Sequence, residues 1–552
     1  MPRSVQARDT AAVAALCVAA VVIPLVLAAS AGAVGVPGND DWIYMRAASS
    51  LFHTGTTDLP PTTAAFWGQL LMVQPLLWLS GGDPWAFTAF GLLMAAVAVA
   101  CTYLLARSYL GTESATLVVL TVVLFPGFAR ESASFMTDVP AYALAMLCLL
   151  LGSRWLRDDT KLILFASLGA GLCAVSIRQF TIAAPIAVLA ASWARGRMDE
   201  RTFLAVATGL LAAGLGFVLI LPASTPGHVG LTPPTIGQLL ILGPLFATLA
   251  AVLLPIAALT MGPRLKSFSS AQILVAAAFG CFVAALSAEP FVGNLWTVGG
   301  LGEDELLGGR RDPVLGVGAW FLSRQLALFA TILLVALLLR WCQPHLARVK
   351  SPSDTGAVFI QIARRPDALL ILFLSVYVAE LAAYSLVGPM FDRYLYPIVP
   401  VGAILLLGGV RRTSFGRSRA LSHAALAWLA VSAFAIAANS FAYDAARYRA
   451  GQDAVAMGYQ AQTVDAGLEW VGYHSAGIIN SGAQTYGLMP YDDTWLPSPP
   501  CAVLSNSPLD DPSYRLLRID RLAYQQYLFL GPAEPLYLYG AISMSCPQPP
   551  SA

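Results

Sequence analysis

The sequence predicts a polytopic α-helical membrane protein with a small α/β domain at its C-terminal end. Of its 552 residues, 57% are hydrophobic and only 11% are charged, whereas soluble domains carry about 25% charged residues. Apolar runs long enough to cross a bilayer recur along residues 1–439, and none follows. We therefore expect a membrane domain over 1–439 and an extracytoplasmic α/β domain over 440–552.

Long apolar runs bounded by charges, proline or glycine predict about thirteen spans. They cover 10–34, 84–106, 115–129, 134–153, 161–177, 179–194, 202–221, 235–261, 270–288, 317–340, 367–387, 394–410 and 420–438. The stretches 42–52 and 66–79 are too short to cross. They predict interfacial or re-entrant helices between residues 42 and 80.

The basic residues predict the orientation of these spans. With the N-terminus inside, Lys161, Lys266, Lys350 and most of the arginines fall on the inner side, as the positive-inside rule requires. An odd number of spans then places the C-terminal tail outside. A cleaved signal peptide ending at Ala31-Gly32-Ala33 is an alternative, although the first apolar run is longer than a typical signal h-region.

The C-terminal region predicts one helix and three short strands. The helix is expected over Tyr443–Trp470, and the strands over Cys501–Ser505, Tyr514–Ile519 and Pro535–Ile542, between turns rich in proline and glycine. Two of the eight cysteines, Cys501 and Cys546, fall outside. Because oxidation is favoured there, we expect them to form a disulfide.

An acidic pair, Asp40 and Asp41, stands at the end of the first span with Trp42 and Tyr44 behind it. A carboxylate at the membrane surface stays ionised while facing whatever the spans enclose. That position suits a general base acting on a substrate delivered by a lipid. The simpler interpretation, that the pair only marks the end of the span, stays open.

Three further polar clusters fall on the same predicted outer side. They are Arg130-Glu131 with Asp138, the turn at Arg178, and Asp392-Arg393-Tyr394. Arginine can hold a phosphate by paired hydrogen bonds that lysine cannot match, and a nearby carboxylate can take the proton of a hydroxyl. Together these groups describe glycosyl transfer from a lipid-phosphate sugar. Two local alternatives remain, since Asp138 could cap the next helix and Arg393 could pair with Asp392.

The order and common side of these motifs resemble the bacterial family 39 type of GT-C glycosyltransferase. This group includes protein O-mannosyltransferases and the aminoarabinose transferases of lipid A. The resemblance rests on the acidic pair, Thr137–Pro140, Arg178-Gln179, and Asp392–Tyr394 with Pro397 and Pro400, and in layout it covers roughly residues 1–440. A thirteen-span core with an outer C-terminal domain is also found in the group.

The resemblance implies an inverting transfer from a polyprenyl-phosphate-linked sugar on the outer face of a bacterial inner membrane. By analogy the catalytic residues are Asp40 or Asp41, as base, with Asp138 orienting the acceptor or the sugar. Arg178 and Arg393, with Tyr394, would bind the donor phosphate, although many relatives carry lysine near the position of Arg178. Sugar or acceptor contacts would come from Trp42, Tyr44, Arg130, Glu131 and Asp392. Some relatives bind a divalent cation, but no clear metal-ligand set appears in this sequence.

Other functions are weighed against this one. The net charge of +1 gives no case for nucleic acid, and no nucleotide-binding or zinc motif appears. A secondary transporter would also have many spans and intramembrane charges, but the two halves show no repeat and the charges gather at one face. A non-catalytic lipid-binding scaffold is the third alternative. The sequence names neither the sugar nor the acceptor.

Overall fold

The structure is a computed structural model. It describes residues 3–57, 66–223, 239–261, 268–286, 316–346, 365–386, 390–408, 416–475, 500–518, 523–525, 530–542 and 546. The predicted inner residues Lys266 and Lys350 lie outside these ranges.

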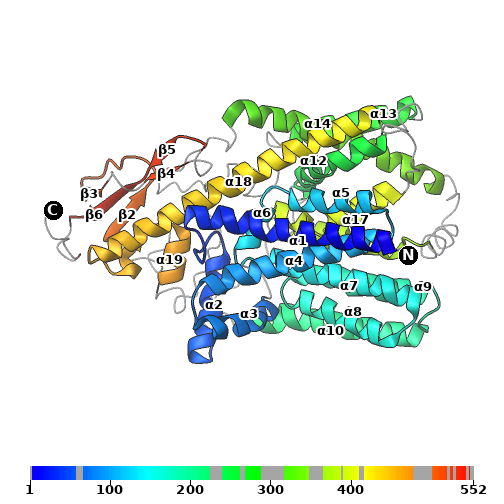
Figure 1. The fold of residues 1–552 in the computed structure, drawn as a ribbon, viewed down its shortest axis with the longest axis horizontal. Coiled ribbons are helices and arrows are strands. Elements are labelled where there is room, and N and C mark those ends of the chain that lie inside the picture. The colour runs from blue at the N-terminus through cyan, green and yellow to red at the C-terminus, as the bar shows by residue number, and fades with distance from the viewer. Residues whose placement is uncertain are drawn as a thin grey trace.

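Helices make up nearly all of the membrane domain (Figure 1). Up to the middle of the chain they are α1 (Arg3–Ala31), α2 (Asp41–Thr54), α3 (Trp67–Ser80), α4 (Trp85–Arg107), α5 (Thr112–Val123), α6 (Phe128–Ala133), α7 (Asp138–Asp158), α8 (Lys161–Val175), the 3₁₀ turn η1 (Gln179–Ile182), α9 (Ala183–Ala194), α10 (Glu200–Ala223) and α12 (Leu242–Met261). Then follow α13 (Ser270–Leu286), α14 (Gly316–Leu346), α16 (Ala368–Ser385), η3 (Asp392–Leu395), α17 (Ile398–Gly408), α18 (Gly416–Ala456), η4 (Ala461–Thr463) and α19 (Leu468–His474).

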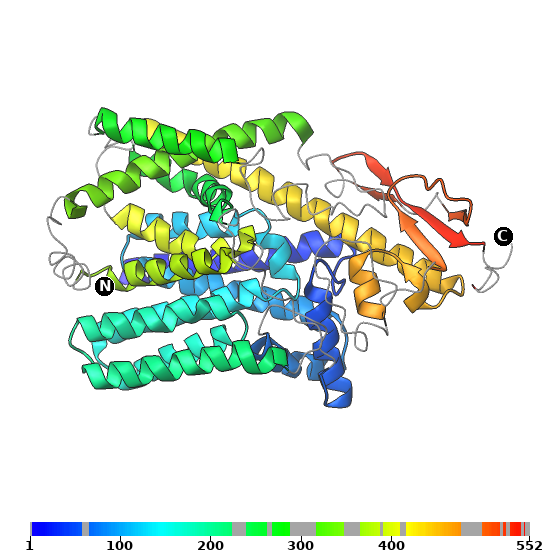
Figure 2. The same ribbon diagram turned by 180° about the vertical axis from the view of Figure 1, so that it is seen from behind.

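The long helices lie roughly parallel, with the N-terminus at one end of the bundle and the C-terminal strands beyond the other (Figures 1 and 2). Within the described ranges, 7 helices are long and apolar enough to cross a membrane, and four shorter apolar helices accompany them. The chain is therefore a multi-pass membrane protein, as predicted. The count of about thirteen spans stays a prediction, because several predicted spans run into undescribed residues.

The two short helices predicted between residues 42 and 80 are confirmed as α2 and α3. Both lie at the end of the bundle that faces the strands (Figure 2). The start of α3 is held by backbone hydrogen bonds from Phe66 N to Ile177 O (3.1 Å) and from Gly68 N to Ser176 O (3.2 Å). These bonds join α3 to the turn that carries Arg178.

One helix, α18, runs without a break from the membrane domain into the C-terminal region, over 41 residues. The predicted boundary between residues 439 and 440 lies inside it. The helix predicted over Tyr443–Trp470 is not a separate element, since α18 continues to Ala456 and α19 begins at Leu468. Hydropathy falls after residue 438, but no proline interrupts the helix there. The helix therefore continues past this point, and only its surroundings change.

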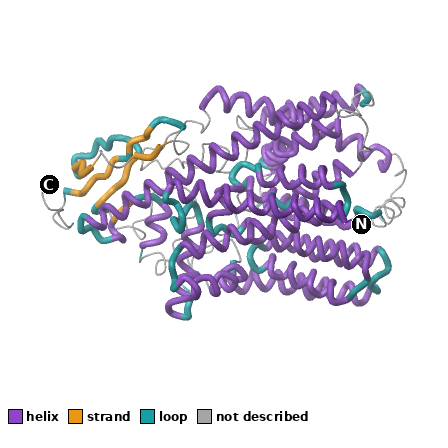
Figure 3. The backbone as a smooth tube through the Cα atoms, viewed as in Figure 1, coloured by secondary structure: helices purple, strands orange, loops and turns teal. Residues whose placement is uncertain are grey.

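The C-terminal strands form a four-stranded sheet and a small two-stranded one (Figure 3). The strands are β1 (Val464–Asp465), β2 (Ala502–Ser505), β3 (Tyr514–Arg518), β4 (Ala523–Gln525), β5 (Ala533–Pro535) and β6 (Tyr537–Ala541). The larger sheet has the order β1-β2-β6-β3, with β1 parallel to β2 and the other neighbours antiparallel. The three predicted strands are confirmed, with the third divided into β5 and β6, whereas β1 and β4 were not predicted.

A stripe of alanines on α18 supports this domain. Ala442, Ala446, Ala450 and Ala454 are buried in one cluster with Leu504 and Leu538 of the sheet. Residues four apart share one helix face, and small side chains allow the strands to approach the helix closely. The helix that runs through the membrane domain is thus also the platform of the C-terminal domain.

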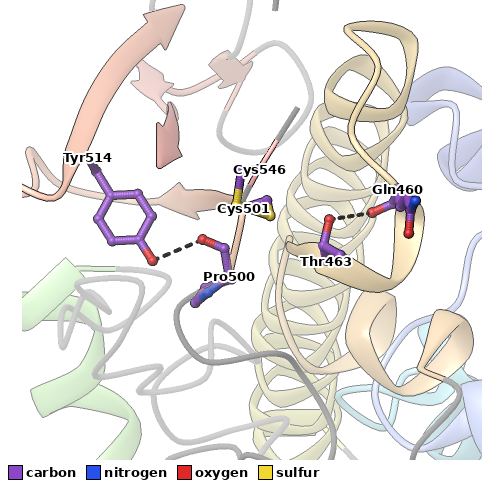
Figure 4. The surroundings of a disulfide bond; sticks show 6 residues. All are labelled: Gln460, Thr463, Pro500, Cys501, Tyr514 and Cys546. Atoms are coloured by element: carbon purple, nitrogen blue, oxygen red, sulfur yellow. Dashed lines mark hydrogen bonds between the residues drawn. A yellow bond between two sulfur atoms is a disulfide. The ribbon is translucent and has the colours of Figure 1, made fainter. Parts of the chain in front are cut away.

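The predicted disulfide between Cys501 and Cys546 is confirmed (Figure 4). It joins the residue before β2 to the segment after β6, across 45 residues of chain. Backbone hydrogen bonds from Cys501 N to Thr463 O (2.8 Å) and from Ala541 N to Cys501 O (2.9 Å) hold the same corner. The C-terminal segment is therefore fastened to the sheet.

Candidate active site

The two neighbouring aspartates after α1 have different surroundings. Asp41 is fully buried and accepts hydrogen bonds from Gly38 N (2.6 Å) and Phe135 N (3.3 Å). Asp40 keeps 26% of its side chain exposed and lies 3.5 Å from a terminal nitrogen of Arg393. Asp41 therefore holds the backbone together, whereas Asp40 is accessible beside a cation.

The loop before these two aspartates contains a tight turn, and the two carboxylates point in different directions. Asn39 has φ 60°, a left-handed conformation that asparagine tolerates better than most residues. At Gly38 a Cβ would lie 2.7 Å from Oδ2 of Asp444, so a larger residue there would push against the Arg130–Asp444 pair. The backbone geometry of this loop fixes where Asp40 stands.

Asp138 is the centre of the site because two arginines share one of its oxygens. Oδ2 of Asp138 lies 3.1 Å from Nη2 of Arg178 and 3.3 Å from Nε of Arg393. Asp138 is the first residue of α7, Arg178 immediately precedes η1, and Arg393 belongs to η3. Three segments far apart in the sequence thus meet at a single carboxylate oxygen. Arg393 pairs with Asp40 and Asp138, and Asp392 instead accepts the backbone N–H of Arg393 (2.8 Å).

Aromatic rings cover the two guanidinium groups. The guanidinium of Arg178 lies 5.5 Å from the ring centre of Tyr394, and that of Arg393 lies 4.3 Å from the ring centre of Phe391. Tyr377 donates a hydrogen bond to the backbone carbonyl of Tyr394 (3.0 Å). Cation–π contacts of this kind orient an arginine without using its N–H donors.

A small cavity opens at this cluster. Its lining residues are Asp138, Ala141, Tyr142, Arg178, Phe180, Thr181, Tyr377, Arg393, Tyr394 and Pro397. Both arginines are at least 95% buried as residues, and a buried cation requires anionic partners. The cavity therefore offers an anion two guanidinium groups against apolar and aromatic walls.

Two further buried acids are close enough to Arg393 to feel its charge, and some of their oxygens have no hydrogen-bond partner among the described residues. They are Glu131, with both oxygens, and Asp392, with Oδ2. Burial raises the pKa of Glu131 above its ordinary value and that of Asp392 to about 7, while the charge of Arg393 opposes both shifts. Burial also raises the pKa of Asp40, again against Arg393 and Arg178.

The predicted aromatic contacts are enclosed in the protein. Trp42 is fully buried and packs on Gly472 of α19, where a Cβ would lie 2.5 Å from the indole. Tyr44 is buried against Phe66, with ring centres 5.2 Å apart. In this structure both rings serve as packing between α2 and its neighbours, and their contact with a sugar remains a prediction.

Near the site, Asp444, Arg447 and Glu469 were not predicted from the sequence, whereas Arg130 was. Arg130 pairs with Asp444 of α18 at 3.0 Å, and Arg447 pairs with Glu469 of α19 at 3.5 Å. Asp444 and Arg447 lie three residues apart, on one face of a helix. That spacing is the sequence signal that could have identified Asp444 and Arg447. It was missed because residues 440–552 were assigned to a separate domain. In the described part of the chain, no group of three or more His, Cys, Asp or Glu residues is arranged to hold a metal ion.

Comparisons with known proteins agree with the predicted resemblance. Residues 64–225 match the family model described as dolichyl-phosphate-mannose-protein mannosyltransferase, which confirms that resemblance over this segment. No curated protein matches.

Three solved structures are similar at low identity. ArnT from Cupriavidus metallidurans bound to undecaprenyl phosphate is 12% identical, with 96% of this chain and 99% of that chain covered and a TM-score of 0.42. ArnT from the same organism in the apo state is 13% identical, with 95% and 97% covered and a TM-score of 0.41. The oligosaccharyltransferase AglB from Archaeoglobus fulgidus is 13% identical, with 79% and 58% covered and a TM-score of 0.35.

Proposed function

We propose that the chain is a membrane glycosyltransferase that moves a sugar from a polyprenyl-phosphate donor to the hydroxyl of an extracytoplasmic acceptor. The observation that carries the proposal is the cavity in which Arg178 and Arg393 share Oδ2 of Asp138, with Asp40 beside Arg393. The family-model match over residues 64–225 supports the same class of donor. The acceptor belongs to a glycan, a lipid or a protein.

The two arginines are assigned to the donor phosphate. A phosphate oxygen can replace Asp138 as the shared acceptor, because phosphate and carboxylate present similar paired oxygens to a guanidinium. Asp138, displaced from the arginines, would then accept a hydroxyl of the sugar or the acceptor. The aromatic wall around Tyr394 keeps water away, which strengthens the charge interactions.

The reaction is a single displacement with Asp40 as general base. The acceptor oxygen forms a bond to the anomeric carbon on the face opposite the phosphate. The bond from that carbon to the phosphate oxygen breaks, and its electron pair stays on the phosphate, where Arg178 and Arg393 stabilise the charge. The hydroxyl proton passes to the Asp40 carboxylate. The configuration at the anomeric carbon is inverted.

Asp40 is preferred to Asp41 as the base because of accessibility. Both oxygens of Asp41 are used by backbone amides and the residue is fully buried. A base must come within hydrogen-bond reach of the proton that it takes, and only Asp40 is partly exposed beside the cavity arginines.

The site is proposed to face outward. Helices α2 and α19 and the C-terminal strands lie at the end of the bundle away from the N-terminus (Figure 1), and Asp40 directly precedes α2. Single cysteines at Gln462 and Lys161, in a background without the exposed Cys173 and Cys281, test this in intact cells. An impermeant thiol reagent should label Gln462→Cys alone. Labelling of Lys161→Cys alone would invert the orientation.

Incubation of the purified protein with a panel of polyprenyl-phosphate sugars tests the function. One donor should be consumed, with release of polyprenyl phosphate, and the Asp40→Asn variant should not consume it. Consumption of no donor, together with solute uptake into proteoliposomes, would favour a secondary transporter. Donor binding without consumption or uptake would favour a non-catalytic lipid-binding scaffold.

A further inference from the structure

The loop between α1 and α2, which leads to Asp40, is held by residues from the far end of the chain. Nη1 of Arg449 in α18 donates to the carbonyl of Ala31, where α1 ends (3.2 Å), over a separation of 418 residues. Glu469 in α19 accepts the backbone N–H of Asn39 (3.1 Å), over a separation of 430 residues. The start and the end of this loop are therefore both fixed by the C-terminal region.

The helix that follows Asp40 is held by the same neighbour. Trp42 of α2 is fully buried and packs on Gly472 of α19, where a Cβ would lie 2.5 Å from the indole. Nη1 of Arg46 donates to the carbonyls of Gly472 (3.0 Å) and Ser475 (2.6 Å). The backbone on both sides of Asp40 is thus fastened to α19 and its end.

Glu469 supports the loop where its backbone conformation is least common. Asn39 has φ 60°, a conformation that few residues other than glycine adopt, and it directly precedes Asp40. The second oxygen of Glu469, Oε2, lies 3.5 Å from Nη2 of Arg447. Arg447 is itself held in place, because its Nε donates to the carbonyl of Ala466 (3.2 Å). The carboxylate that supports the turn is therefore anchored to α18.

Charged side chains of both signs act on the Asp40 carboxylate. Burial raises its pKa most, the cations Arg393 and Arg178 lower it, and the anions Glu469 and Asp138 raise it. Asp138 contacts both arginines, so Glu469 is the anion that acts from outside their cluster. A negative charge nearby favours the protonated form of a carboxyl group, which makes Asp40 a stronger base.

We infer that Glu469 is a positioning residue for the transfer reaction, because it holds the turn at Asn39 that places Asp40. Its negative charge also acts on the Asp40 carboxylate. The inference rests on the proposed function and adds to it a role for the C-terminal region, which keeps the base in place. The donor phosphate is assigned to other residues, Arg178 and Arg393. A change at Glu469 should therefore alter turnover and leave donor binding intact.

Steady-state kinetics of the purified full chain, with the donor found in the panel, test the positioning role. Glu469→Ala removes the acceptor of the Asn39 N–H, so kcat should fall roughly 10–100-fold, since a misplacement of about 1 Å can cost about 100-fold. The donor KM should stay within a few-fold of wild type. Glu469→Gln keeps an acceptor oxygen and should restore kcat to within a few-fold.

The matched control is Asp511→Ala in the C-terminal domain. Its carboxylate also accepts a backbone N–H, that of Ser513 (2.8 Å), but it does not contact the loop. Turnover per folded molecule should equal that of wild type. A fall in kcat as large as that of Glu469→Ala would assign both effects to the general stability of the domain and overturn the positioning role.

The pH profile gives a readout that a purely structural role would not move. Glu469→Gln removes an anion, so the pKa of Asp40 falls and the acid limb of kcat/KM moves to lower pH. If Glu469→Ala does not fold, this shift decides alone, and an unmoved limb overturns the inference. A wild-type kcat in Glu469→Ala, with normal donor consumption, also overturns it and leaves the proposed function standing. Failure of donor consumption in the wild type removes the function itself.

Discussion

The two ends of the helical bundle hold their paired charges in different ways. At the N-terminal end, Arg107 contacts both oxygens of Asp9 through Nε and Nη2, each at 2.8 Å. Tyr103 and Thr112 add hydrogen bonds to the same carboxylate, at 2.9 and 2.8 Å. At the opposite end, two arginines approach one oxygen of Asp138 at 3.1 and 3.3 Å.

This difference separates a structural ion pair from a binding site. Asp9 and Arg107 form a two-point pair of the kind that uses guanidinium and carboxylate fully. Arg178 and Arg393 each meet Asp138 through one nitrogen, beside a cavity. Burying two cations away from water costs free energy unless nearby anions offset it. Both arginines share one oxygen of Asp138, and Arg393 also faces Asp40 at 3.5 Å, so the Asp138 contacts are single-point and suited to exchange with a phosphate.

The largest expected effect comes from Asp40→Asn. The change removes a base while preserving shape, and loss of a general base typically lowers the rate 10²–10⁴-fold. Donor consumption by the purified variant measures it, and donor binding should persist. The matched change at the other end, Asp9→Asn, should leave turnover per folded molecule within a few-fold of wild type. If Asp40→Asn stays that active, the base is another residue, such as Asp138.

Next in size are Arg178→Lys and Arg393→Lys. Lysine keeps the charge but loses the planar pair of donors, so each variant should bind the donor roughly 10–100-fold more weakly, as for a lost hydrogen bond to a charged group. Competition with labelled polyprenyl phosphate measures the affinity. Arg107→Lys, with its partner Asp9 at the N-terminal end of the bundle, is the control and should not change the affinity. Donor affinity equal to that of wild type in both Arg178→Lys and Arg393→Lys would contradict a phosphate role.

Part of this arrangement was predictable from the sequence. Composition and hydropathy define the fold class, and the placement of Cys501 and Cys546 outside predicts the disulfide. The positive-inside bias correctly gathered Asp40, Asp138, Arg178 and Arg393 on one side. This bias could not show that Arg178 and Arg393 share Asp138 as their partner, because those contacts join three distant segments through tertiary packing.

Other features were beyond sequence reasoning for identifiable reasons. Asp40 and Asp41 are the same residue type at adjacent positions, and only the left-handed turn at Asn39 separates their roles. The contribution of α18 was hidden because hydropathy falls where the helix leaves the apolar surroundings. Asp444 therefore appeared to belong to a separate domain, although it pairs with Arg130 of the site.

Asp41→Asn sharpens the contrast within the acidic pair. Asparagine can accept only one of the two amide hydrogen bonds and turns an NH₂ group toward the other donor. We expect a loss of about 1–3 kcal/mol in the free energy of unfolding, seen as a lower melting temperature in detergent. Turnover per folded molecule should stay close to wild type, the reverse of the pattern for Asp40→Asn. A stable but inactive Asp41→Asn protein would make Asp41 the base.

The smallest expected effect is a shift in the pH profile of kcat/KM, whose acid limb reports the base of the free enzyme. Burial raises the pKa of Asp40, and the charge of Arg393 opposes that rise. As the pH falls through this pKa, Asp40 takes up a proton and activity is lost. Arg393→Gln removes the opposing charge, so the pKa rises further and the acid limb moves to higher pH, by about one unit or more for a neighbouring opposite charge. Arg107→Gln changes a cation at the other end and should leave the limb in place. If the acid limb is the same in Arg393→Gln and wild type, the group that titrates is not near Arg393. The general base would then not be Asp40.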